Sequence, residues 1–131
     1  MKPILPLLFR LALALVPVTA AGAAGQPPSQ VAGREIEQLF AALESSRCQF
    51  YRNGSWHGAA EASAHLRRKY EYLAERGLTP SAEAFIERAA SQSSVSGKPY
   101  LVRCGTAEAV ESRVWFMGKL REMRASARTP G

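Results

Sequence analysis

Cys48-Gln49-Phe50-Tyr51-Arg52-Asn53-Gly54 is a short alternating segment that ends in a turn, and Tyr100-Leu101-Val102-Arg103-Cys104 is its counterpart near the other end of the chain. Asn-Gly is turn chemistry, and Pro99 forbids helix before the second segment. In an antiparallel pair, opposed residues have a constant sum of residue numbers. Placing Cys48 opposite Cys104 therefore pairs Phe50 with Val102 and Arg52 with Tyr100. The cysteines and the apolar residues then share one face, as a single register requires.

This pairing predicts a two-stranded antiparallel ribbon closed by a Cys48–Cys104 disulfide. The two cysteines are an even count, which favours a disulfide in an oxidising compartment, and two buried free thiols are the alternative. No C-x-x-C spacing is present to lower a thiol pKa, so a redox role is not expected.

Four helices are predicted from apolar residues at helical spacing. They run from about Gly33 to Ser46, from His57 or Gly58 to Arg76, from Thr79-Pro80 to about Ala90, and from about Ala107 to Arg124. The expected inward faces are, in chain order, Ile36, Leu39, Phe40 and Leu43; Ala59, Ala62, Leu66, Tyr70 and Leu73; Ala82, Phe85, Ile86, Ala89 and Ala90; and Val110, Val114, Met117 and Leu120.

The ends of these helices also have sequence signals. Glu35 and Glu37 are expected in the first turn of the first helix, where the helix dipole favours acids. Gly77 is expected to stop the second helix, and Thr79 to cap the third with Pro80 at its first position. Four helices and a short ribbon give the predicted fold, a mainly α single domain with one disulfide.

The beginning of the chain has the layout of a secretory signal peptide. Lys2 and Arg10 precede or interrupt a short apolar run, and small residues around Ala23 offer a cleavage site. The apolar run is too short to span a bilayer, so we expect no stable membrane span after cleavage. The predicted organisation is a signal peptide (1–23), a flexible linker (24–33), a globular domain (34–124) and a frayed tail (125–131), in a periplasmic or secreted protein.

Composition narrows the function classes. The chain has 131 residues, 17 Lys+Arg and 11 Asp+Glu, for a net charge of +6. Loss of the leader with Lys2 and Arg10 reduces this to +4 on a mixed surface. That charge is a weak argument for any anionic partner, and no nucleic-acid partner is expected. All the acids are Glu, which excludes EF-hand loops, Ser-His-Asp triads in their usual form and paired aspartates. We expect neither a metal nor a cofactor.

A polar stripe begins at His57. His57, Glu61 and His65 follow one another at i, i+4 and i+8 on the second predicted helix. His57 and Glu61 are expected to face away from its core stripe, and His65 to lie near the border of that stripe. Two imidazoles and a carboxylate on adjacent turns can share a proton or hold a metal. The structural alternative is that Glu61 serves the helix dipole and His57 lies outside the helix.

Two loops add further candidates. The planar guanidinium of Arg52 can donate two parallel hydrogen bonds to a carboxylate or a phosphate. Asn53 next to it offers an amide, and Trp56 could stack on a sugar or a base. Ser94 and Lys98 lie in a Ser- and Gly-rich loop whose backbone amides could cradle an anion. The alternative in both places is ordinary turn chemistry.

The same residues resemble the YfeK-like family of small bacterial secreted proteins. One block is Phe50-Tyr51-Arg52-Asn53-Gly54, His57, Glu61-Ala62, His65-Leu66 and Lys69; the other is Ser81-Ala82-Glu83, Phe85-Ile86, Ala90-Ser91, Ser93-Ser94 and Ser96-Gly97-Lys98-Pro99-Tyr100. The likeness covers about residues 34 to 120. The family usually has Thr where Ser81 stands, and its members do not all carry both cysteines. The resemblance implies export but no reaction, since the family is a domain of unknown function.

We therefore expect a binding module rather than an enzyme, with an envelope component or a small anionic ligand as partner. The candidate ligand-binding residues are Arg52, Asn53, His57, Glu61, His65, Ser94 and Lys98. Two other interpretations remain open. One is a small hydrolase that uses His57 or His65 as base, with Glu61 and a serine hydroxyl. The other is a structural polar knot that binds no ligand.

Overall fold

The computed structural model describes residues 29–129, together with Pro3, Ala14, Leu15 and Pro17. The predicted signal peptide (1–23) thus lies, apart from those four positions, outside the described residues. The elements, in chain order, are α1 (Gln30–Ser45), β1 (Gln49–Arg52), β2 (Ser55–Gly58), α2 (Ala59–Ala74), α3 (Ala82–Ala89), β3 (Leu101–Arg103), β4 (Val110–Glu111) and α4 (Ser112–Arg128).

The strands form one antiparallel sheet in the order β2-β1-β3-β4. The predicted pairing of Phe50 with Val102 is confirmed, and so is the disulfide. The prediction of a two-stranded ribbon is wrong, because the Asn-Gly turn folds Ser55–Gly58 back onto β1 and Val110–Glu111 adds to β3. Both outer strands are short and partly polar, which left them without a clear alternating pattern.

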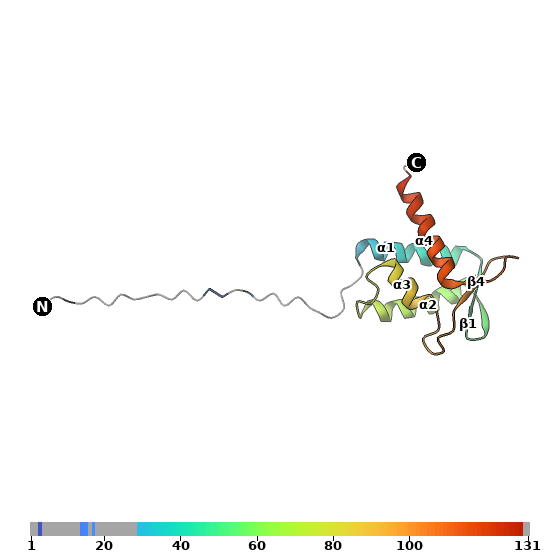
Figure 1. Cartoon of the computed structure of the whole chain (residues 1–131), viewed down its shortest axis with the longest axis horizontal. Helices are drawn as coiled ribbons and strands as arrows, with labels where there is room; N and C mark the ends of the chain where they lie inside the picture. The colour runs from blue at the N-terminus through green and yellow to red at the C-terminus, as the bar shows by residue number, and fades with distance from the viewer. Residues whose placement is uncertain (1–2, 4–13, 16, 18–28, 130–131) are drawn as a thin grey trace.

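α2 and α4 pack against the strands, and α1 and α3 pack on these two helices; the helices lie mostly to one side of the sheet in Figure 1. The central ring is Phe85 on α3, which contacts Phe40 of α1, Tyr70 of α2 and Phe116 of α4 at centroid distances of 5.3, 5.6 and 6.3 Å. The predicted inward faces of the first three helices are buried or packed against this core, with Ala59 half-buried. Phe50 of β1 and Val102 of β3 are buried in the same core, so the sheet packs against the helices through these two side chains.

The first two helices begin at different residues from those predicted. α1 begins at Gln30 rather than Gly33, with Ser29 as its cap, so Glu35 and Glu37 lie beyond its first turn. α2 begins at Ala59, and His57 belongs to β2. Gly77 ends α2 as expected: it has a φ of 65°, and the Leu78 N–H donates to the Leu73 carbonyl.

The start of α3 is set by Ser81, whose Oγ accepts a hydrogen bond from the Ala84 N–H at 3.1 Å. The predicted cap, Thr79, is instead buried before the helix. α3 therefore starts at Ala82, later than the predicted start at Thr79-Pro80. With this start, all the predicted inward residues of the helix lie in the core.

α4 starts at Ser112 rather than Ala107, because Val110 pairs with β3 and the Ser112 N–H donates to the Tyr100 carbonyl at 2.8 Å. Val110 and Val114, predicted to face inward, are 41% and 53% exposed, and Phe116 takes the core position. The helix continues to Arg128, and its last turns project away from the body in Figure 1.

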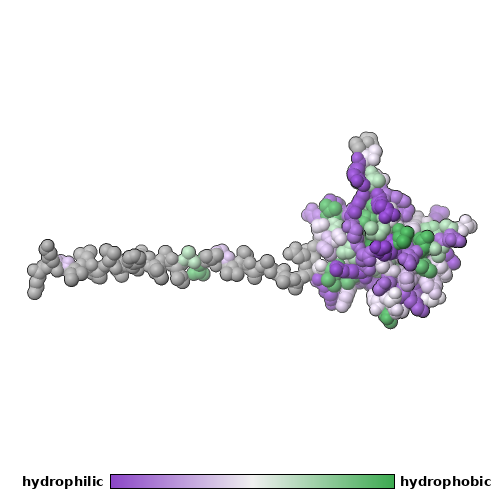
Figure 2. All heavy atoms as spheres, viewed as in Figure 1, coloured by the Kyte–Doolittle hydropathy of each residue, from purple (hydrophilic) through white to green (hydrophobic). Residues whose placement is uncertain are grey.

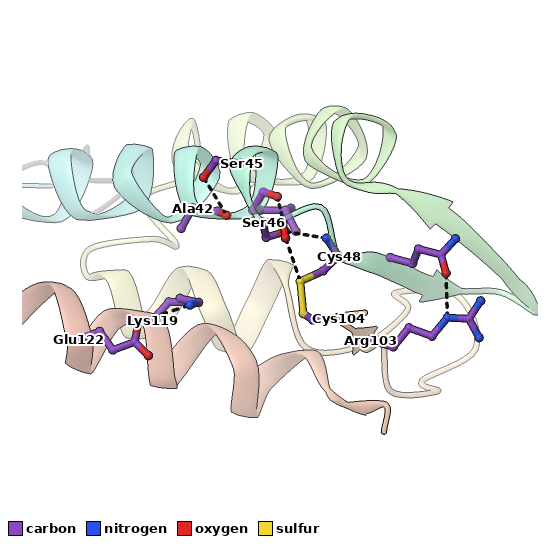
Figure 3. The surroundings of a disulfide bond; sticks show 10 residues. Ala42, Ser45, Ser46, Cys48, Arg103, Cys104, Lys119 and Glu122 are labelled. Atoms are coloured by element: carbon purple, nitrogen blue, oxygen red, sulfur yellow. Dashed lines mark hydrogen bonds and ion pairs between the residues drawn. A yellow bond between two sulfur atoms is a disulfide. The ribbon is translucent and has the colours of Figure 1, made fainter. Parts of the chain in front are cut away.

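The disulfide joins the residue before β1 to the residue after β3, with a Cα–Cα distance of 4.3 Å (Figure 3). Ser46 and Arg47 form the turn that leads into it. The Ser46 hydroxyl donates to the Leu43 carbonyl and accepts from the Cys48 N–H, and Arg47 has a φ of 57°. The end of α1 and the start of the sheet are thus held in a fixed relation.

Figure 2 shows a mainly hydrophilic surface on the folded part, with a small apolar area near the start of α4. In the part of the chain that the structure describes, no helix combines the length and the apolar character needed to cross a membrane.

Candidate functional site

The hairpin turn decides which side chains share a face of the sheet. Asn53 and Gly54 both have positive φ, at 49° and 86°, as a two-residue hairpin turn of type I′ requires. The turn pairs Phe50 with His57 and Tyr51 with Trp56. Because neighbouring residues on a strand point to opposite faces, Arg52 and His57 lie on the helix-covered face with Phe50.

His57 and Glu61 connect that strand to α2. The Nδ1 of His57 lies 3.1 Å from Oε1 of Glu61, and the two side chains are 19% and 64% exposed. The predicted i, i+4 contact therefore exists, although it spans the strand–helix junction rather than one helical turn.

His65 is one turn further along α2 and contacts Tyr100, which is only 2% exposed. The His65 Nε2 and the Tyr100 hydroxyl are 3.2 Å apart. Lys69 donates to the same hydroxyl at 3.2 Å and to the Gln92 carbonyl at 3.1 Å. Tyr100 and Lys69 are members of the site that the candidate list did not include.

The charges that shift the His65 pKa are all positive. Burial and, after it, the Arg52 and Lys69 cations together lower the His65 pKa to about 4, so its ring is neutral at pH 7. Burial also lowers the pKa of Lys69 and raises that of Tyr100. The Nε of Arg52 is buried without a hydrogen-bond partner. We call Arg52, His65, Lys69 and Tyr100 the basic cluster.

Asn53 and Lys98 lie at a different place. With Tyr51, Gly54, Ser96 and Pro99 they line a cleft of about 320 Å³ between the hairpin turn and the loop that precedes β3. Sequence reasoning placed Asn53 and Lys98 together with Arg52, but the pleat of the sheet separates Arg52 from Tyr51 and its cleft.

Ser94 is exposed in the loop between α3 and β3, and its neighbour Ser93 organises that loop. The buried Ser93 hydroxyl accepts from the N–H groups of Val95 and Ser96, both at 3.2 Å, and the Ser93 N–H donates to the Lys98 carbonyl. The structure thus brings four of the seven candidates to the helix-covered face (Arg52, His57, Glu61 and His65), two to the cleft (Asn53 and Lys98), and leaves Ser94 apart from both.

The contacts of the two imidazoles bear on the chemistry. Within residues 29–129 His57 pairs with Glu61 and His65 with a tyrosine hydroxyl, so neither forms the serine–base pair that the hydrolase interpretation needs. A search of the described residues for three or more His, Cys, Asp or Glu side chains placed to hold a metal ion finds none.

Residues 30–124 match a family described as "Family of unknown function (DUF5329)". This chain belongs to that family. It is also 42% identical over 62 residues to the uncharacterized protein YfeK of Salmonella typhimurium (strain LT2), which confirms the YfeK-like resemblance. That match covers 47% of this chain and 50% of the relative, so the chain spans about half the length of the curated relative it matches. No solved structure matches the chain.

Family membership assigns no reaction or ligand, so the function is argued from geometry. The disulfide is compatible with an exported protein, since such bonds persist in oxidising compartments.

Proposed function

We propose that this protein is an exported binding module whose basic cluster holds an anionic group. The observation that carries the proposal is the buried, unpartnered Nε of Arg52, a cation that acts on His65 together with the half-buried Lys69. Buried cationic nitrogens normally meet a carboxylate or another acceptor, because an unpaired charge away from water is costly.

The acid among the candidate residues, Glu61, does not fill this role. Glu61 is 64% exposed and contacts His57, and it does not appear among the charges that shift the His65 pKa. An anion at the cluster would supply the missing acceptor. Arg52 offers a planar fork for its oxygens, and Lys69 offers a point charge.

His65 and Tyr100 suit the same ligand. Because the imidazole is neutral at pH 7, it can donate a hydrogen bond without adding repulsion to the two cations. The Tyr100 hydroxyl already accepts from Lys69, which leaves its own proton for His65 or for an anion oxygen. Together these groups favour a small oxyanion, either a phosphate or a carboxylate.

Thermal unfolding with inorganic phosphate tests the proposal, with chloride at equal ionic strength as reference. A ligand at ten times its Kd stabilises the folded state by about 1.4 kcal/mol, which raises the Tm of a domain of this size by roughly 6–11 °C. Arg52→Gln should remove that increase. The exposed Arg121→Gln on α4 is the matched control and should keep it.

Acetate in a parallel series distinguishes a carboxylate from a phosphate preference. The proposal fails if neither anion raises the Tm more than chloride does. It also fails if Arg52→Gln responds to both anions as the wild type does. A loss of stability in Arg52→Gln without any anion response of the wild type indicates the polar knot.

A further inference from the structure

The sheet face that points away from the helices carries aromatic side chains. Tyr51 and Trp56 are cross-strand partners there, with ring centroids 5.2 Å apart and planes tilted by 57°. Both rings are half-buried, whereas Phe50 on the opposite face is fully buried. Two adjacent aromatic rings on an outer face are a ready contact surface rather than part of the core.

Arg103 holds this aromatic pair in place. Its Nε donates to Oε1 of Gln49 at 2.8 Å, the bond drawn from Arg103 to the neighbouring strand in Figure 3. Its guanidinium lies 4.0 Å from the centroid of the Trp56 ring. A cation stacked on the ring and tied to the strand reduces the freedom of Trp56, so little ordering is needed on binding.

Tyr51 also forms one wall of the 320 Å³ cleft, which continues the aromatic surface past the hairpin turn. The other walls offer the Asn53 amide, the Ser96 hydroxyl and the Lys98 ammonium. Lys98 is exposed, and no acidic residue lines the cleft. The volume is at the small end of the range of about 300–1,000 Å³ for small-molecule sites.

We propose that the Tyr51–Trp56 pair and this cleft form a saccharide-binding site that prefers a sugar with an acidic group. The apolar face of a sugar ring can pack on the aromatic rings, and its hydroxyls match the amide and hydroxyl groups of Asn53 and Ser96. The acidic substituent would meet Lys98 through a charge-assisted hydrogen bond. This site lies on the opposite face of the sheet from the basic cluster and does not depend on it.

The choice of a saccharide rests on the mixture of groups. The Ser96 Oγ already accepts from the Lys98 N–H at 3.3 Å, but a purely apolar ligand would take water from the Asn53 amide and the Ser96 hydroxyl proton without replacing its hydrogen bonds, which costs binding free energy. A free anion would make no use of the aromatic pair. An acidic sugar uses all of these groups.

Binding is measured by fluorescence of Trp56 in a Trp115→Phe background, which removes the other tryptophan of the chain. The probes are oligomers of glucose and of glucuronate of equal length, with glucose 6-phosphate as a phosphate-bearing sugar. We expect the acidic sugars to bind about three- to tenfold more tightly than the neutral oligomer, because solvent screening at the exposed Lys98 weakens a charge-assisted hydrogen bond.

Lys98→Ala should abolish that preference while leaving neutral-sugar binding intact, and Lys98→Arg should restore it. Amide shifts in NMR spectra should map to Tyr51, Gly54 and Ser96. Tyr51→Ala should weaken all three sugars, and its folding is checked by the same spectra.

Three results would overturn the inference: no sugar binds, neutral and acidic sugars bind equally to the wild type, or the shifts map to another surface. A nucleotide or a peptide that binds the cleft more tightly than the sugars would do so as well. The phosphate response of the basic cluster depends on Arg52 and not on Lys98, so the two proposals can fail independently.

Discussion

Acidification to about pH 5 should destabilise the protein through His65. The folded-state pKa of this imidazole is about 4, against an ordinary value of 6.5, because burial and the neighbouring Arg52 and Lys69 cations disfavour its charged form. Above pH 6.5 the ring is neutral in both states. As the pH falls below that value, the unfolded chain takes up a proton that the folded chain refuses until about pH 4, so stability is lost across this window.

The size of the loss follows from the two pKa values. Between about pH 7 and pH 5 the linkage relation gives an upper limit of about 1.8 kcal/mol. His65 is partly exposed, and solvent screening reduces this to about 1 kcal/mol. Pairing lowers the pKa values of Glu35 and Glu37, so their stabilising effect is lost only below about pH 4.5. Ending the series at pH 5 therefore keeps the contribution of these two glutamates small, and the comparison with a His65 variant isolates the histidine.

Urea unfolding of the wild type and of His65→Gln at the two pH values is the assay. The wild type should lose about 1 kcal/mol more than the variant between them. A second readout is the NMR titration of the His65 ring, expected near pH 4. Equal pH dependence of the two proteins would refute the reasoning, and so would a His65 ring that titrates near 6.5, because the positive surroundings of the basic cluster would then be absent.

Three further predictions test the fold. Cys48→Ala combined with Cys104→Ala opens a loop with a sequence separation of 56 and should cost about 4 kcal/mol in urea unfolding; a loss below about 1 kcal/mol would contradict this. Phe85→Ala should cost about 3–5 kcal/mol by calorimetry, because its ring contacts three other aromatic rings, and a small loss would mean that the core is not centred there. Gly54→Ala, at a φ of 86°, should destabilise the protein by about 1–2 kcal/mol and raise amide exchange in the hairpin. Its control, Gly33→Ala inside α1, should stabilise the protein by about 0.5–1 kcal/mol. Equal effects of the two substitutions would be evidence against the turn.

Much of the fold could be predicted from the sequence where the deciding information is local. The apolar stripes of α1, α2 and α3 are periodic over several turns, and they gave the correct buried faces. The pairing of Phe50 with Val102 followed from requiring that two cysteines and two apolar residues share one face. Each of these inferences uses a spacing that leaves little freedom once the element type is known.

The errors occur where a contact distant in sequence decides. Val110 fits a helical stripe, but its pairing opposite Val102 makes it a strand residue and delays α4. Ser55–Gly58 is too short and too polar to show an alternating pattern, and the spacing of His57 and Glu61 also fits a helix. The Asn-Gly turn was the available signal, since it is the strongest short-range indication of a hairpin.

The same distinction applies to the candidate site. Arg52 and His65 were found because their residue types invite chemistry. Lys69 and Tyr100 were missed as site members because they meet across 31 positions of chain, and a lysine among other basic residues resembles a solvated surface. Their importance appears only when burial and the pKa of each group are considered together.

The geometry of one strand explains why a single motif serves two surfaces. Tyr51 and Arg52 are adjacent in sequence, so the pleat sends Tyr51 to the outer cleft and Arg52 to the basic cluster. The turn fixes the register on one side of β1, and the disulfide fixes it on the other. A slip of one residue would exchange the faces, burying Tyr51 in place of Phe50 and removing Arg52 from His65. Both proposed binding surfaces therefore require the hairpin turn and the disulfide, because these two features hold the register of β1. Neither the turn nor the disulfide contributes a ligand-binding cation to either surface.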